Sequence, residues 1–72
     1  MKPETLKKYL GKRVGILYNA EIRERVMRGT LAWMKDPFFN TYGFVLLMKG
    51  DEMARINPWN VVEIAILGRK KK

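Results

Sequence analysis

Short apolar runs separated by turn-forming residues constrain the fold of this chain more than any other feature. Between Val14 and Tyr18 apolar residues recur at every second position, the period of a strand with one buried face. Further predicted strands occupy residues 24–35, 42–48, 53–56 and 61–67, of which residues 42–48 are apolar on both faces. The segments between them are rich in turn formers, namely Asn19-Ala20, Asp36-Pro37, residues 49–52 and Asn57-Pro58-Trp59. The pattern predicts a mainly β fold, with five short antiparallel strands bent into a small SH3-like barrel.

A short helix is predicted before the first strand, over residues 3–10. Pro3 suits a first helical turn, and Gly11 suits a left-handed stop. Leu6, Tyr9 and Leu10 share one face at helical spacing. So short a helix does not form alone, so we expect this face to dock on the sheet.

Two further features of the strands concern a bend inside the chain and an exposed edge. Gly29 lies inside the second strand, where we expect a bend or a bulge. Residues 60–67 are rich in β-branched side chains, and Glu63 is their only charged residue. An exposed edge of this kind pairs with other chains unless it is blocked. We therefore expect one edge to pair with the opposite edge of the next subunit, closing a ring.

The composition excludes several classes of protein. The 72 residues contain neither Cys nor His, so disulfides are absent and a transition-metal site is not expected. The acidic residues form no paired arrangement suited to general acid–base chemistry, so we expect neither an enzyme nor a cofactor. No apolar run is long enough to span a membrane, so we expect a cytoplasmic protein without a membrane partner. The 47% hydrophobic content is high for so short a chain and favours contact with a partner subunit.

Charge favours a polyanionic partner. The net charge is +8, and residues 69–72 supply +4 of it as a basic tail. Residues 1–68 form the single predicted domain, with most of its positive charge before residue 31. Arg23, Arg25 and Arg28, together with Lys12 and Arg13, form a second basic cluster that either follows a phosphate backbone or is simply a solvated face. The tail likewise either contacts nucleic acid or only keeps the protein in solution.

Two short motifs resemble those of the Sm-like (LSm) RNA-binding proteins, of the archaeal type. Gly29-Thr30-Leu31 matches the family's Gly-x-Leu step. The segment from Asp36 to Asn40 keeps the spacing of the family's Asp-x-x-Met-Asn, with Phe39 in the Met place. Ile56, Val61 and Ile64 follow the offsets of the second motif. The step from Gly29 to Asp36 is one residue longer than usual, which a bulge in the second strand would absorb.

The resemblance implies particular site residues. The family stacks a base on the residue two after the Asp and recognises the base edge with the Asn, which gives Phe38 and Asn40. The family's Arg-Gly pair is Asn57-Pro58 here, and Asn offers only a neutral amide where Arg adds charge and stacking. The further candidate residues for contact with RNA are Asp36, Trp59 and Arg55.

Each assignment has a structural alternative. Phe38 and Phe39 could fill the core beneath the loop, with Asn40 capping a turn. We expect Trp59 to fill the end of the barrel and Arg55 to face solvent, with contacts to RNA as the alternatives.

The resemblance implies a hexamer or heptamer ring that binds short U-rich single-stranded RNA, in RNA processing or ribonucleoprotein assembly, alongside other RNA-processing proteins. Two alternatives stay open. One is a monomeric SH3-like barrel that binds duplex DNA non-specifically. The other is a structural ring scaffold whose RNA site has decayed through the Asn57-Pro58 change.

Overall fold

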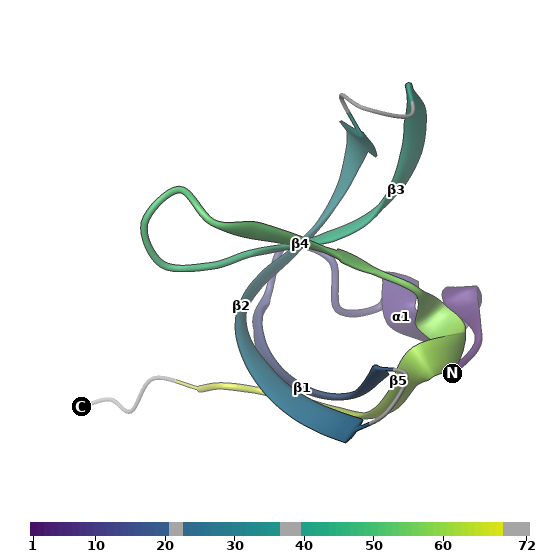
Figure 1. Cartoon of the computed structure of the whole chain (residues 1–72), viewed down its shortest axis with the longest axis vertical. Coiled ribbons are helices and arrows are strands. Elements are labelled where there is room, and N and C mark those ends of the chain that lie inside the picture. The colour runs from purple at the N-terminus through teal and green to yellow at the C-terminus, as the bar shows by residue number, and fades with distance from the viewer. Residues whose placement is uncertain (21–22, 37–39, 69–72) are drawn as a thin grey trace.

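The computed structural model describes residues 1–20, 23–36 and 40–68. One short helix precedes five strands, and a 3-10 turn separates the last two (Figure 1). In chain order the elements are α1 (Pro3–Lys7), β1 (Arg13–Ala20), β2 (Arg23–Asp36), β3 (Thr41–Leu47), β4 (Met53–Ile56), η1 (Pro58–Asn60) and β5 (Val61–Ile66). The predicted helix and five strands are therefore confirmed, and the chain is mainly β.

All five strands belong to one antiparallel sheet, in the order β4-β3-β2-β1-β5. The sheet bends strongly around β1 and β2 (Figure 1). It does not close, because β4 pairs only with β3 and β5 only with β1 among the described residues. The sequence predicted a barrel, and the described residues form an open, bent sheet with two edge strands instead.

The core lies on the concave side of this sheet and is capped by the helix. Its buried residues come from every strand and from α1: Leu6, Val14, Ile16, Leu31, Phe44, Leu46, Ile56 and Val61. Tyr9 and Leu10 pack against this cluster, as the helical spacing predicted, although α1 itself ends at Lys7. Gly11 has a φ of 81°, which confirms the left-handed stop, and its N–H donates to the Leu31 carbonyl at 2.8 Å.

Strand β1 is longer than predicted. Asn19 and Ala20, expected to open a turn, still pair with Glu24 and Arg23 of β2. The hairpin partner holds these residues in the ladder, which overrides their local preference for a turn. Between Leu17 and Tyr18 the pairing with β5 shifts register, so Val62 of β5 is left out of the ladder as a bulge.

Gly29 marks a close approach rather than a bulge. Gly29 pairs with Val14 of β1, and the next residue, Thr30, pairs with Leu47 of β3. Neither ladder shifts register at this point. A Cβ on Gly29 would stand 3.0 Å from the Leu47 carbonyl carbon, so only glycine fits where β2 bends against β3. The extra residue before Asp36 is therefore accommodated in a regular ladder, and the predicted bulge in this strand is wrong.

The described part of the chain has no helix of the length and apolarity needed to cross a membrane. It also has no cluster of three or more His, Cys, Asp or Glu residues able to hold a metal ion.

Candidate nucleic-acid interface

The turn between β4 and β5 presents an aromatic ring beside an amide. Asn57 precedes η1, and its Oδ1 accepts from the Trp59 backbone N–H at 3.1 Å. The Asn57 backbone N–H donates to the Tyr18 hydroxyl of β1 at 3.0 Å, which ties the turn to the sheet. With the backbone held at both points, the Trp59 side chain is 66% exposed. The expectation that Trp59 fills the barrel end is wrong, because the capped turn directs it out of the core.

The Asn57 side chain retains hydrogen-bonding capacity after it caps the turn. An Asn amide has one carbonyl oxygen and two N–H donors, and only the oxygen is used in the contact with Trp59. Asn57 is exposed, so its two donors are accessible to solvent on the same turn as Trp59. An aromatic face and amide donors on one fixed turn suit the stacking and edge recognition of an unpaired base.

The other candidate residues belong to the β2–β3 hairpin. Asp36 is the last residue of β2, and its backbone pairs with Thr41 of β3. Asn40 is exposed at the turn into β3 with a φ of 57°, a conformation that Asn adopts more readily than most residues. Phe38 and Phe39 lie outside the described residues, so their predicted roles are untested. Asn40 is thus both a turn residue and an accessible amide.

Arg55 lies on β4, which pairs with β3 of the hairpin and leads into the η1 turn. It pairs with Val45 of β3 and is exposed, as expected. Its guanidinium extends along β3, where one of its terminal nitrogens stands 3.0 Å from the place a Cβ on Gly43 would take. The Arg55 guanidinium therefore lies over the sheet surface at Gly43, toward the tip of the β2–β3 hairpin.

The candidate residues therefore fall into two groups. Asp36 and Asn40 are at the tip of the β2–β3 hairpin, whereas Asn57 and Trp59 are at η1 near the helix. Figure 1 shows the hairpin projecting away from the sheet and η1 beside α1. Within one chain these groups do not form a single pocket.

The arginines of the predicted basic cluster divide between the two ends of the β1–β2 ladder. Arg13 pairs with Thr30, and Arg28 pairs with Gly15, so Arg13 and Arg28 are diagonal neighbours on one face of the sheet. Arg23 and Arg25 pair with Ala20 and Tyr18 at the far end. Among the arginines of the predicted cluster, the ladder therefore brings Arg13 and Arg28 together and places Arg23 and Arg25 apart from them. Two hollows adjoin this pair, of about 560 and 320 Å³.

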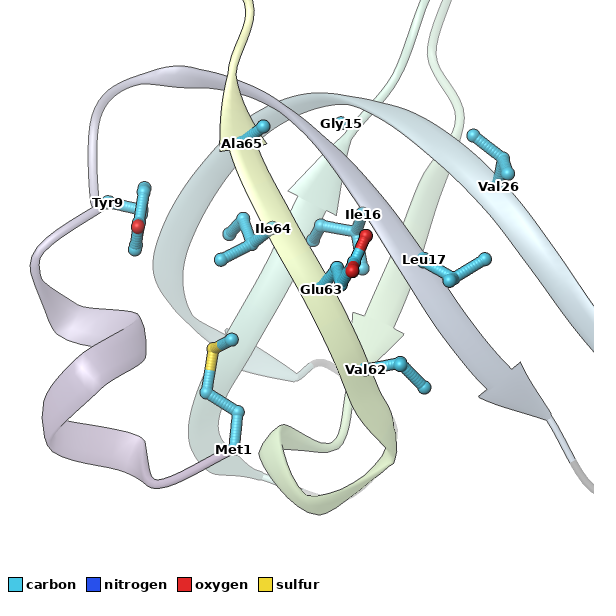
Figure 2. A pocket seen from close by; sticks show the side chains of 10 residues that line it. All are labelled: Met1, Tyr9, Gly15, Ile16, Leu17, Val26, Val62, Glu63, Ile64 and Ala65. Atoms are coloured by element: carbon cyan, nitrogen blue, oxygen red, sulfur yellow. The ribbon is translucent and has the colours of Figure 1, made fainter.

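A third hollow, of about 650 Å³, straddles the free edge strand β5. Figure 2 shows β5 crossing it, with Met1, Tyr9 and Ile64 on one side and Leu17, Val62 and Val26 on the other. Val62 and Ile66 of β5 are 48% and 53% exposed. This hollow is an apolar strand edge rather than an enclosed cavity.

Two features of the interface were not foreseen from the sequence. The Tyr18 hydroxyl anchors the η1 turn, although alternation had marked Tyr18 only as a core-facing residue. Trp33 of β2 packs edge-on against Phe44, with ring centroids 5.0 Å apart, and is still 49% exposed. Trp33 alternates with the buried Leu31 but lies closer to the hairpin tip, beyond the core. Its position near the tip was the sequence signal that could have predicted partial exposure.

Neither a protein-family model, nor a curated protein, nor a solved structure matches this chain.

Proposed function

We propose that this protein is a ring-forming, SH3-like module of the Sm-like kind that binds short U-rich single-stranded RNA. The observation that carries the proposal is the η1 turn, where an exposed Trp59 stands beside the amide of Asn57 on a backbone anchored by Tyr18. Tryptophan is enriched at interfaces, where a partner covers its large apolar face and its indole N–H finds a hydrogen-bond partner. Stacking a base on such a face contributes about 1–3 kcal/mol.

Charge supports a nucleic acid as the partner. The net charge is +8, and the described basic side chains include exposed arginines on both faces of the β1–β2 pair. Phosphate contacts would supply affinity, and the aromatic and amide groups on the turns would favour unpaired bases over a duplex.

The two open edges support assembly into a ring. β4 carries Met53, which is 53% exposed, and β5 carries the exposed Val62 and Ile66. Neither edge has a partner strand among the described residues. Pairing β4 of one subunit with β5 of the next would cover both edges and repeat around a closed, hexameric or heptameric, ring. Such a ring would also bring the hairpin of each subunit near the turns of another, which a single chain does not do.

RNA binding is tested by fluorescence anisotropy with a labelled U-rich oligonucleotide. We expect Trp59→Ala to weaken binding about 5- to 150-fold, the equivalent of losing one stacked base. Val26→Ala is the control, because Val26 is 67% exposed on β2 and carries no aromatic or polar group. Equal affinity of the Trp59→Ala and Val26→Ala variants for this RNA would refute the role of the turn.

The hairpin residues are tested separately. Phe38→Ala combined with Asn40→Ala removes the stacking and edge-recognising groups that the resemblance implies. We expect this variant also to lose affinity for U-rich RNA while retaining the native mass of the wild type. Unchanged affinity would eliminate the hairpin from the RNA site.

Assembly is tested by native mass from light scattering. A particle six or seven times the monomer mass is expected, and Val62→Lys with Ile66→Lys should shift it toward monomer by placing charges on the β5 edge. A wild-type monomer at micromolar concentration would refute the ring. A monomer with equal affinity for duplex DNA and single-stranded RNA would indicate the DNA-binding alternative instead. A ring that binds neither would indicate a scaffold.

A further inference from the structure

Arg13 of β1 and Arg28 of β2 lie on a hollowed surface whose lining contains no acidic residue. Arg13 and Arg28 line both hollows described above. The larger one is completed by Lys49 and by residues of β2 and β3, and the smaller one by Leu67 and Gly68. We refer to Arg13, Arg28 and Lys49 as the arginine groove.

The sheet holds the two arginines together. They are diagonal neighbours on one face of the β1–β2 ladder, at about 7–8 Å between backbones. Both side chains are exposed, and both strands are interior strands of the sheet, so neither backbone is free to move away. Two like charges at this distance repel each other, and a bound polyanion would relieve that repulsion.

The acidic residues nearest the groove in the described part of the chain lie outside its lining. Asp51 and Glu52 follow Lys49 in the β3–β4 turn, but neither lines the two hollows of the groove. Glu63 faces this side of the sheet four residues further along β1, opposite Leu17. The sequence after Gly68, which lines the smaller hollow, continues with one arginine and three lysines.

The groove lacks the groups that recognise bases. Its lining contains no aromatic side chain and no side-chain amide, and the uncharged members are glycine, threonine, leucine and methionine. Guanidinium and ammonium groups bind phosphate oxygens whatever the base. The chemistry therefore fits the backbone of a nucleic acid rather than its sequence.

We propose that the arginine groove is a second RNA-contacting site, which binds the phosphodiester backbone without regard to base. It extends the proposed function, because the same strand would be recognised by base at the η1 turn and held by its phosphates at the groove. The groove itself depends only on its own charges and shape. Inorganic polyphosphate, which has phosphates and no bases, therefore isolates it from the η1 turn.

The experiment compares two double variants that lose the same charge. Arg13→Gln with Arg28→Gln alters the groove, and Arg23→Gln with Arg25→Gln removes two exposed arginines from the other end of β2. Each single-strand phosphate contact contributes about 0.7 to the slope of log affinity against log salt. A variant that has lost two contacts should therefore have a slope smaller by about 1.4 than that of the wild type. Between about 50 and 200 mM salt, its affinity for RNA would fall by a factor about seven times smaller than the wild-type factor.

We expect the groove variant to lose binding of polyphosphate and to weaken U-rich and A-rich RNA equally. The control variant should keep a slope close to that of the wild type. Equal losses in both double variants would show an unspecific charge effect and overturn the proposal. Arg13→Lys with Arg28→Lys should retain polyphosphate binding, which separates lost phosphate contacts from a folding defect.

Failure of this proposal differs from failure of the proposed function. If Trp59→Ala weakens RNA binding and the groove variant does not, the groove is wrong and the η1 turn stands. If no variant of the turn affects RNA but polyphosphate binding depends on Arg13 and Arg28, the groove stands and the base-recognition proposal is wrong.

Discussion

Replacing Gly29 by alanine tests a close approach of β2 to β3. A Cβ there would overlap the Leu47 carbonyl oxygen, its nearest neighbour, and would stand 3.0 Å from the Leu47 carbonyl carbon and 3.1 Å from Leu46 Cγ. Unstrained carbon contacts lie near 3.5–4.0 Å, so both neighbours would have to move by roughly half an ångström or more. Leu46 is fully buried and Leu47 is paired with Thr30, so neither can move without loosening the core or the ladder.

The size of the effect follows from two opposing contributions. Overpacking of this kind costs about 1–3 kcal/mol. Alanine also lowers the entropy of the unfolded chain relative to glycine, which returns about 0.4–1 kcal/mol. Gly29 does not have the positive φ that would add strain of its own. We expect a net loss of roughly 1–2 kcal/mol, or a fall in Tm of roughly 4–16 °C for a domain of this size.

Gly15→Ala is the matched control. Gly15 is also an interior-strand glycine without a positive φ, and the nearest atoms to its Cβ would be those of the Leu67 side chain, with Cδ2 at an ordinary 3.4 Å. Thermal and urea unfolding followed by far-UV circular dichroism, at one protein concentration for all variants, would measure both effects. We expect Gly15→Ala to match or slightly exceed the wild type. Equal stability of the two variants would refute the close approach of β2 to β3.

Substitutions at three further residues test the helix and the η1 turn. Leu6→Ala removes the fully buried contact of α1 with the core and should cost about 2–5 kcal/mol in urea unfolding; a loss below about 1 kcal/mol would mean that the helix is not docked. Tyr18→Phe removes the acceptor of the Asn57 N–H and should cost about 0.5–1.5 kcal/mol, with a shift in the Trp59 fluorescence if the turn loosens. Asn57→Ala should cost about 1 kcal/mol and Asn57→Asp, which keeps the capping oxygen, much less; equal losses would contradict the cap.

Much of the fold follows from local pattern. The alternation from Val14 to Tyr18 identified the buried face of β1, and the helical spacing of Leu6, Tyr9 and Leu10 identified the docking face of the N-terminal segment. Residues 53–56 were predicted with the bounds that the structure has. These predictions succeed because the periods of the two secondary structures differ and the core is on one side of the sheet.

What the sequence did not provide depends on pairing between distant strands. Asn19 and Ala20 stay in β1 only because β2 pairs with them. Gly29 forms no bulge because β2 keeps its register with both β1 and β3. The exposure of Trp59 depends on two hydrogen bonds, one of them to Tyr18 across 39 positions of sequence. The sequence likewise grouped five basic residues into one cluster. Only the register shows that Arg13 and Arg28 are neighbours, whereas Arg23 and Arg25 lie at the opposite end of the β1–β2 ladder.

The bulge at Val62 has a consequence for how subunits would come together. It interrupts β5 after Val61, so the regular part of that edge is the four-residue stretch 63–66, and β4 on the opposite edge also has four residues. A junction built from so short a ladder would be weak by itself, and a pair of subunits would separate readily. The last subunit to join a ring makes two such junctions at once, in effect an intramolecular step. Assembly under the proposed ring would therefore be all-or-none in protein concentration, with free subunits and closed rings present and open arcs scarce.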